Sequence, residues 1–203
     1  FSFKQLRDSN CALFLTMNVS DRDEYKPYFT LFLNECLAYL SKNKDGHSIK
    51  CLLDEFGSSF GNIKKFPTYI ATLRKNKVAL FLAVQSIDQI KKYYPHNYKT
   101  IVSNCLTKLI LGGSEHDDCT YFSKLCGEFS FPVGKESLND GSNINTSNKS
   151  TSESDSSGSG FSIEIKKQTL ISSSEIRELD VDKGLCIIGN EKPFLFESRP
   201  YYL

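Results

Sequence analysis

Apolar residues along the chain fall into two patterns, short continuous runs and longer segments of helical period. The continuous runs cover residues 11–19, 49–53, 78–84 and 105–111, and polar residues or glycine bound each of them. Short runs of this kind are typical of strands that are buried on both faces of a sheet. We therefore predict four strands at these positions.

The segments between these runs repeat apolar residues every three or four positions, as amphipathic helices do. Residues 56–63 are instead rich in glycine and serine, which indicates a loop. Helices are predicted at 25–40, at 64–75, from Ile87 onward, from Pro95 to Asn104, and at 117–126 with Gly127 ending the last one. Strands alternating with helices predict βαβ units and a parallel sheet with right-handed crossovers.

The character of the sequence changes between residues 137 and 160. This segment holds nine serines, four asparagines and three glycines, and its only apolar residues are Leu138 and Ile144. Such a composition buries too little surface to offset its ordering entropy, so we expect a disordered loop within one domain. Beyond it, the alternation at 163–165 predicts a strand, Ser174 begins a short helix, and 185–188 with 194–197 form a closing hairpin.

These elements predict one α/β unit over residues 1–203, with three layers, a mainly parallel sheet, helices on both faces and a C-terminal hairpin. The chain opens at Phe1 instead of a methionine, and we expect it to be a piece of a longer protein. Its longest apolar run is too short to cross a bilayer, which needs about 20 residues. We expect this piece to be soluble.

The net charge and the cysteine content exclude one class of nucleic-acid-binding domain and indicate a cellular compartment. The formal net charge is +1, which excludes a basic field over the whole domain for gripping nucleic acid. Local clusters such as Lys64–Lys65 are interpreted as solvated helix faces in preference to a DNA groove. Seven cysteines, an odd number with several inside apolar runs, suit reduced and buried thiols in a cytosolic protein.

An acidic pair, Asp54 and Glu55, follows the apolar strand at 49–53. Ligands of parallel sheets bind at the carboxyl ends of strands, and this arrangement is that of a Walker B motif. Asp54 would then hold Mg²⁺ through water, and Glu55 would orient and polarise the water that attacks ATP. An acidic pair at a strand end also occurs in solvated loops, so the pair alone does not define an ATPase.

The next strand and the helix before it supply two further candidates. Gln85 follows the run at 78–84, where its side chain could sense the γ-phosphate beside the acidic pair, or else cap the next helix. Arg74 closes the intervening helix and is a candidate arginine finger for a neighbouring subunit's nucleotide. Its alternative role is that of a helix-terminal cation opposite the helix dipole.

The phosphate-binding P-loop pattern, GxxxxGK[ST], is absent from the sequence. Gly134-Lys135 is followed by Glu136, and the first glycine of the pattern is missing. Without a P-loop the triphosphate has no cradle. We therefore predict half a nucleotide site in this chain, with the other half upstream in the longer protein, and no ATP hydrolysis by this piece alone.

Taken in order, the motifs resemble the VirD4/TraG/TraD coupling proteins of type IV secretion. The resemblance rests on LLDEFG (52–57), LRK (73–75), VQS (84–86), DQIKKYY (88–94), TIVSNCLTKLILGG (100–113), SEHDDCTYFSKLCG (114–127) and QTLISSSEIREL (168–179) with KPFLFESRPYY (192–202). It covers nearly the whole chain apart from the serine-rich loop. Gln168 departs from the family pattern, which often has arginine at that position.

The resemblance implies a partial RecA-like P-loop NTPase core that uses ATP and Mg²⁺. It gives Asp54 and Glu55 the Walker B roles, Gln85 the sensor role and Arg74 the interface-arginine role. It further implies an ATP-driven motor that moves single-stranded DNA with attached relaxase to a type IV secretion channel. Such a motor would be a homo-hexamer at the cytoplasmic face of the bacterial cell membrane.

Three other functions share parts of this pattern. A VirB4-type secretion ATPase shares a Walker B strand, a helix that ends in Arg-Lys and a glutamine strand, and an FtsK/HerA-like DNA translocase is a second alternative. A third is a non-catalytic module that only docks partners, which a P-loop in the upstream sequence would exclude. The blocks TIVSNC (100–105) and SSSEIREL (172–179) favour the coupling proteins over the VirB4 type.

Overall fold

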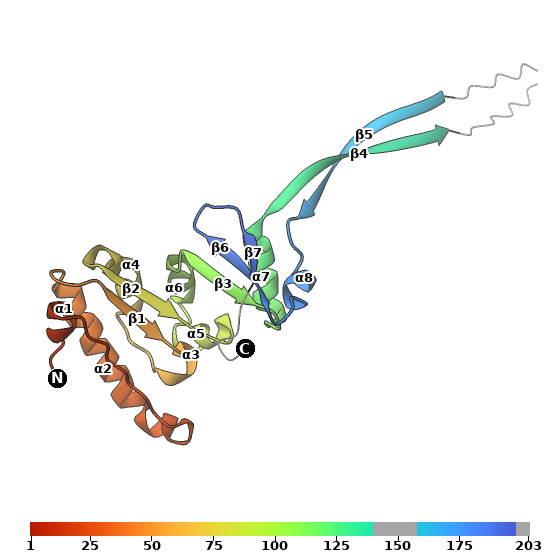
Figure 1. Cartoon of the computed structure of the whole chain (residues 1–203). Coiled ribbons are helices and arrows are strands. Elements are labelled where there is room, and N and C mark those ends of the chain that lie inside the picture. The colour runs from red at the N-terminus through yellow and green to blue at the C-terminus, as the bar shows by residue number, and fades with distance from the viewer. Residues whose placement is uncertain (140–157, 198–203) are drawn as a thin grey trace, which may run out of the picture.

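The computed structural model describes residues 1–139 and 158–197, with side chains for 1–134 and 163–197. The chain begins with α1 (Gln5–Asp8), a 3-10 turn η1 (Val19–Asp21) and the long helix α2 (Arg22–Lys42) (Figure 1). In this described part, no helix combines the length and the apolar content that crossing a bilayer requires. The predicted helix at 25–40 is confirmed as the central part of α2.

The next elements contain the only parallel strand pair of the described chain. They are β1 (Ile49–Leu53), α3 (Phe56–Ser59), α4 (Phe66–Thr72), η2 (Leu73–Asn76), β2 (Val78–Leu82), α5 (Ile87–Tyr93) and α6 (Tyr98–Asn104). The register runs from Ile49 beside Val78 to Leu53 beside Leu82. Both predicted strands are confirmed, and the expected loop at 56–63 begins with the short helix α3. We call residues 1–104 the first region.

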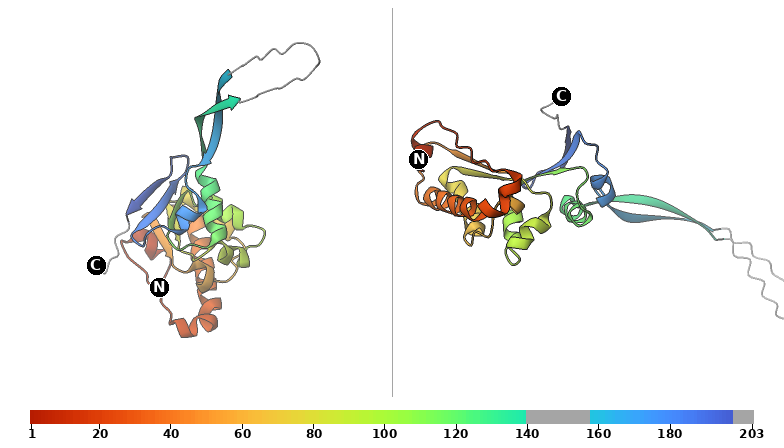
Figure 2. Two further views of the ribbon diagram at one scale, coloured as in Figure 1. Left: turned by 90° about the vertical axis from the view of Figure 1, so that its right-hand side faces the viewer. Right: turned by 90° about the horizontal axis from the view of Figure 1, so that it is seen from below.

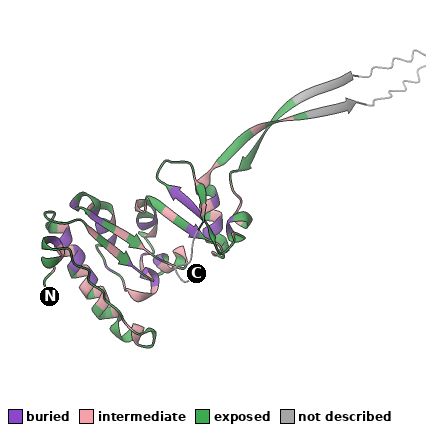
Figure 3. Ribbon diagram, in the orientation of Figure 1, coloured by how far each residue is buried: buried purple, intermediate pink, exposed green. Residues whose placement is uncertain are grey.

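The first region has a core in which helices pack against one face of the two strands (Figure 3). Phe66 is fully buried, and its ring lies 4.5 Å from that of Phe56 and 6.0 Å from that of Tyr94, measured between centroids. The buried members are Leu33, Cys36, Leu37, Leu40, Leu53, Phe56, Ile63, Phe66, Tyr69, Leu73, Val78, Ile90, Tyr94, Ile101 and Val102. This core fixes the ends of β1 and β2 relative to each other.

The opposite face of β1 and β2 is exposed, so helices cover the sheet on one face in this part of the chain. Leu52 is 76% exposed and its neighbour Phe81 is 54% exposed. The expected covering of both faces is therefore only half present in the described residues. A complete α/β domain covers an apolar sheet face of this kind.

The second region, residues 105–197, contains an antiparallel sheet. β3 (Thr107–Leu111) pairs with β6 (Lys183–Ile188), and β6 pairs with β7 (Phe194–Glu197). The predicted strand at 105–111 and the closing hairpin are confirmed, but β3 has an antiparallel neighbour where a parallel one was expected. This difference arises because β6 returns from the far end of the chain to lie beside β3, which no local pattern reports.

Two helices, α7 (His116–Cys126) and α8 (Ser173–Arg177), cover this second sheet. Gly127 ends α7 with φ of 85°, as predicted. Gly112 lets β3 approach α8 closely, because an added Cβ would lie 2.1 Å from the Leu179 carbonyl oxygen. The core is small and consists of Ile110, Cys119, Ile176, Leu185 and Ile187.

A two-stranded ribbon, β4 (Glu128–Asn139) with β5 (Gly158–Thr169), projects away from the body of the molecule (Figure 2). Its paired ends overlap the segment expected to be a disordered loop, which is a correction at 137–139 and 158–160. The strand predicted at 163–165 is confirmed as part of β5. The rest of the predicted loop, 140–157, lies outside the described residues.

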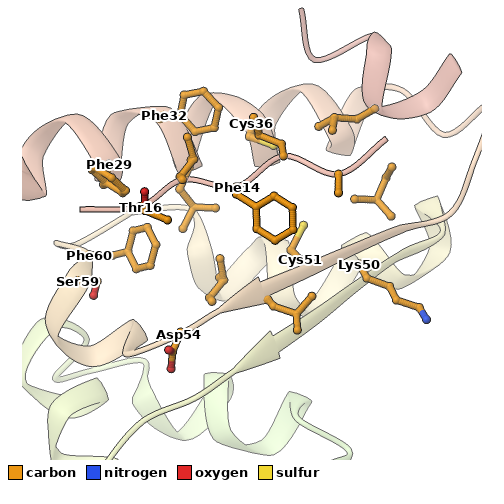
Figure 4. Close-up of a pocket in the computed structure, with 18 of the residues that line it drawn as sticks. Phe14, Thr16, Phe29, Phe32, Cys36, Lys50, Cys51, Asp54, Ser59 and Phe60 are labelled. Atoms are coloured by element: carbon orange, nitrogen blue, oxygen red, sulfur yellow. The ribbon is translucent and has the colours of Figure 1, made fainter. Parts of the chain in front are cut away.

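The prediction of a strand at 11–19 is wrong. Residues 11–18 belong to no helix or strand, and Phe14 is 84% exposed. An apolar run becomes a strand only when a neighbouring strand offers backbone hydrogen bonds. The described residues supply no such partner to this segment, although it passes between α2 and β1 (Figure 4).

Candidate functional site

The carboxyl ends of β1 and β2 are tied together by backbone hydrogen bonds. The Ala83 amide donates to the Leu53 carbonyl at 3.0 Å, and the Phe56 amide donates to the Ala83 carbonyl at 2.9 Å. These two bonds flank Asp54 and Glu55 and hold them beside the segment that carries Gln85. Three of the four predicted site residues therefore share one edge of the parallel sheet.

Asp54 is exposed at this edge (Figure 4). Its Oδ1 accepts a hydrogen bond from the Glu55 amide at 2.9 Å, which orients the carboxylate and leaves Oδ2 without a protein partner among the described residues. Magnesium in nucleotide sites keeps several waters and takes one or two carboxylates together with phosphate oxygens. The Asp54 carboxylate fits that limited role.

Glu55 has a left-handed backbone conformation, with φ of 46° and ψ of 43°. This conformation is unfavourable for a residue with a side chain, by about 1 kcal/mol or more. It lets the Glu55 carbonyl accept from the amides of Ser58 and Ser59, at 2.9 and 2.8 Å, and so begin α3. The strained backbone turns the Glu55 side chain away from the line of β1.

The Glu55 carboxylate lies against a cation that the sequence did not single out. Arg22, the first residue of α2, places its Nη2 2.7 Å from Glu55 Oε2. The Ser58 hydroxyl donates to the same oxygen at 2.9 Å and accepts from Arg22 Nη1 at 3.2 Å. This closed triangle neutralises the charge of Glu55 and restrains its side chain.

Gln85 is exposed and makes a reciprocal pair with a residue of α5. The side-chain Nε2 of Gln89 donates to Gln85 Oε1 at 3.1 Å, and the backbone amide of Gln85 donates to Gln89 Oε1 at 3.2 Å. The Gln85 side chain does not cap α5, because the Ile87 amide at the start of that helix donates to the Asp118 carboxylate. The Gln85 side chain must leave Gln89 before it can contact a phosphate.

Arg74 lies apart from the other three candidates. It is exposed in η2, the turn that leads into the amino end of β2. The acidic pair and Gln85 lie beyond the carboxyl ends of the strands, so the length of β2, about 16 Å for five residues, separates the two sets. Within one chain, Arg74 therefore lies at the amino ends of the strands and Glu55 at their carboxyl ends.

A cavity of about 790 Å³ adjoins the acidic pair, between residues 9–17, α2 and β1 (Figure 4). Burial raises the pKa of the Cys36 thiol to about 12 and that of the Cys51 thiol to about 11, so both thiols are uncharged at neutral pH. Arg22, Asp54 and Glu55 all border the cavity. The charges of the site therefore border a cavity whose buried thiols are uncharged.

Comparison with known proteins points to one family. The family model described as the TraM recognition site of TraD and TraG matches residues 48–181. Among curated proteins, VirD4 of Rhizobium radiobacter is 24% identical over 209 residues, which is 100% of this chain and 28% of that protein. VirD4 of Agrobacterium fabrum is 23% identical and is covered to 29%. The chain thus spans less than a third of these relatives.

Among solved structures, the plasmid coupling protein TrwB in complex with ADP and Mg²⁺ has a TM-score of 0.74 at 16% identity. The match covers 98% of this chain and 43% of that one. TrwB with the non-hydrolysable GTP analogue GDPNP has a TM-score of 0.67 at 14% identity, with 90% and 39% covered. This likeness confirms the expected fold, an α/β chain with part of a RecA-like core.

Proposed function

Because the chain belongs to the family of the TraM recognition site of TraD and TraG, we propose that it supplies the acidic half of an ATPase site in a conjugative coupling protein. The observation that carries the proposal is the pair of hydrogen bonds between the ends of β1 and β2. They hold the carboxylates of Asp54 and Glu55 beside the segment of Gln85 at the carboxyl ends of the two strands, which supports the proposal. The phosphate-binding half would come from other residues of a longer protein.

Each residue at this edge then has a role. Asp54 holds Mg²⁺ through water, and the bound ion offsets the charge of the phosphate oxygens. Glu55 accepts or orients the proton of the attacking water. Gln85 exchanges its hydrogen bonds to Gln89 for contact with the γ-phosphate.

The triangle of Arg22, Ser58 and Glu55 is retained in this proposal. The Oε2 oxygen of Glu55 already accepts from the Arg22 guanidinium and the Ser58 hydroxyl, which leaves Oε1 to accept from the attacking water. The pair with Arg22 then orients the Glu55 carboxylate for that role.

Arg74 serves the nucleotide of a neighbouring subunit in this proposal. Its position at the far edge of the sheet from Glu55 supports a role in trans over one within its own chain. Such a role requires a ring of subunits, and we propose the homo-hexamer that the family resemblance implies. Arginine fingers contribute about 10³-fold or more to turnover in related phosphoryl transfer.

The wider function that we propose follows the relatives. VirD4 and the coupling protein TrwB favour a conjugative motor over a VirB4-type or an FtsK/HerA-like enzyme. The motor would move single-stranded DNA with its attached relaxase to a type IV secretion channel at the cytoplasmic face of the cell membrane. A TraM-like accessory protein is a further proposed partner, since the family description names TraM.

The test uses the full-length protein and the variant Glu55→Gln. An amide cannot take the proton of the attacking water, so we expect magnesium-dependent ATP turnover to fall by about 10²- to 10⁴-fold. Binding of a non-hydrolysable ATP analogue should persist, because Glu55 is not a phosphate ligand. Asp54→Asn should instead weaken binding of the magnesium–nucleotide complex.

The matched control is Glu191→Gln, which removes an exposed carboxylate in the turn between β6 and β7. This variant should turn over ATP like the wild type. Equal turnover by wild type and Glu55→Gln would remove Glu55 from the mechanism. Loss of analogue binding in Glu55→Gln would show that the residue supports nucleotide binding or folding, not the chemical step.

A further inference from the structure

A second cavity lies on the side of α2 away from the acidic pair. It has a volume of about 840 Å³ and runs between α2 and the loop that leads into α4. Lysines border it on both sides, Lys26 and Lys42 from α2 and Lys64 and Lys65 from the loop. We call this cavity the lysine groove. It is separate from the proposed nucleotide site and has no part in the chemistry described above.

The groove is elongated because one row of α2 forms its wall. Lys26, Thr30, Asn34, Ala38 and Lys42 line it and follow one another at intervals of four residues. Residues at this spacing lie on one face of a helix. At a rise of 1.5 Å per residue, the two lysines at the ends of the row are about 24 Å apart along the helix.

Three of the four ammonium groups have no partner. Lys42, Lys64 and Lys65 are exposed, and none of them makes a hydrogen bond or ion pair within residues 1–134 and 163–197. Lys26 is held in place, with Nζ 3.1 Å from the Tyr93 hydroxyl and 3.7 Å from Asp23 Oδ1. The groove therefore presents positive charge at both ends and along the loop.

The middle of the groove has a different character. Glu35 lines it, and its Oε1 accepts a hydrogen bond from Asn34 Nδ2 at 3.1 Å. Leu31 and Ala38 lie on either side of Glu35 in sequence and give this stretch apolar surface. A ligand with uniform negative charge would be repelled at this point, whereas one with acidic ends and a neutral centre would fit.

The lining of the groove distinguishes between two kinds of polyanion that lysines attract, nucleic acids and acidic peptides. Grooves for single-stranded nucleic acid combine cations with exposed aromatic rings on which bases stack. The aromatic residue that lines this groove is Tyr69, which is 6% exposed and offers no stacking face. The mixed lining of lysine, asparagine, threonine and aliphatic side chains therefore favours a peptide over a nucleic acid.

We infer that the lysine groove binds an extended acidic segment of a partner protein. An extended chain rises about 3.3 Å per residue, so about seven residues would span the groove. Acidic side chains at the two ends of the segment would pair with Lys26 and Lys42, and Lys64 and Lys65 would add positive charge from the loop. Its neutral centre would lie over Glu35, Leu31 and Ala38.

The test measures peptide binding to this chain. The probe is a fluorescent seven-residue peptide with two glutamates at each end and serines between them. We expect saturable binding that weakens as salt rises from about 0.05 to 0.5 M, because the screening length shortens over that range. The double variant Lys64→Glu/Lys65→Glu should bind about tenfold or more weakly.

The matched control reverses two exposed lysines elsewhere, Lys166→Glu/Lys167→Glu on β5. This variant has the same net charge change and should retain the wild-type affinity. Lys64→Gln/Lys65→Gln provides a milder change should the reversal disturb folding, as judged by circular dichroism. Equal loss of affinity in groove and control variants would reduce the interaction to net charge and overturn the inference.

A second arm tests the pattern within the groove. A peptide with glutamates throughout should bind more weakly than the one with a neutral centre, and Glu35→Gln should remove this difference. A thymidine oligonucleotide of about ten residues should not compete for the site. Tighter binding of the oligonucleotide through Lys64 and Lys65 would identify a nucleic-acid groove and overturn the peptide assignment, as would no peptide binding at all.

Discussion

The two regions of the chain differ in the size of the core that their described residues form. The first region buries fifteen hydrophobic side chains in one cluster, whereas the described part of the second region has a cluster of five. The second region also has a buried polar contact, in which the Ser123 hydroxyl donates to the Ile171 carbonyl at 2.6 Å. All four candidate catalytic residues belong to the first region. The proposed chemistry therefore lies in the region with the larger described core.

The largest expected effect comes from truncation in the first core. Phe66→Ala should lower the free energy of unfolding by about 3–5 kcal/mol, because it removes a fully buried ring that touches two other rings. Ile176→Ala in the second core should cost about 2 kcal/mol, near the lower end for such changes. Denaturant unfolding followed by circular dichroism measures both values.

Hydrogen exchange would show which elements lose protection of their backbone amides in each of these variants. Phe66→Ala should speed exchange in α2, β1 and β2, and Ile176→Ala should speed it in β3, α7 and β6. Uniform acceleration over both regions by Ile176→Ala would show that the two clusters unfold as one unit. The contrast between the regions would then be one of size alone.

A smaller effect is expected where the regions meet. Asp118 of α7 is 9% exposed, and its Oδ2 accepts from the Ile87 amide at the start of α5 at 2.9 Å. Asp118→Ala removes this cap and should cost about 1 kcal/mol. Asp118→Asn keeps an acceptor and serves as the control, with a smaller loss of stability at neutral pH.

The two Asp118 variants also differ from the wild type in pH dependence. Burial raises the pKa of Asp118, the hydrogen bond from Ile87 lowers it, and the nearby Asp88, Glu115 and Asp117 raise it further. The folded state then binds the proton more tightly than the unfolded state. The Asp118 contribution to stability should therefore decrease as pH rises from about 4 through the raised pKa. Melting curves of Asp118→Asn should lack this decrease, and an unchanged pH profile would contradict the assignment.

The smallest effect is expected at the start of α8. The Ser172 hydroxyl accepts from the Glu175 amide at 3.2 Å, and the Glu175 carboxylate accepts from the Ser172 amide at 2.7 Å. This capping box orders a helix of five residues that carries Ile176 into the second core. Ser172→Ala should cost about 0.5 kcal/mol, which lowers the melting temperature by about 1–2 °C. Thr at this position restores the cap and should recover most of the loss.

Sequence patterns predicted the elements that depend only on residues close together in the chain. The apolar runs that became β1 and β2, and the acidic pair that follows β1, needed no knowledge of distant residues. The run at 11–19 had the same apolar character, yet it formed no strand, because a strand requires a partner that the run itself does not contain. The ribbon was missed at 128–136 for a related reason, since its two strands pair with each other across the segment 140–157.

The candidate site also contains residues that local sequence predicts and one residue that only the fold brings there. Asp54 and Glu55 were predicted from their place at a strand end, and their roles stay predictions until tested. Arg22 was not found, because its link to Glu55 joins residues 33 positions apart and arginine at a helix start has no distinctive pattern. Only the fold brings the first residue of α2 to the end of β1.

Two long-range hydrogen bonds of Arg7 bear on the order in which the chain folds. The buried guanidinium of Arg7 donates through Nη1 to the His47 carbonyl and through Nη2 to the Asn76 carbonyl, both at 2.8 Å. These partners are 40 and 69 residues away in the chain, so neither bond can form before α2, β1 and η2 are already in place. In kinetic terms, we expect the N-terminal segment to dock late in folding. Arg7 would then mainly slow unfolding and contribute little to the rate of folding.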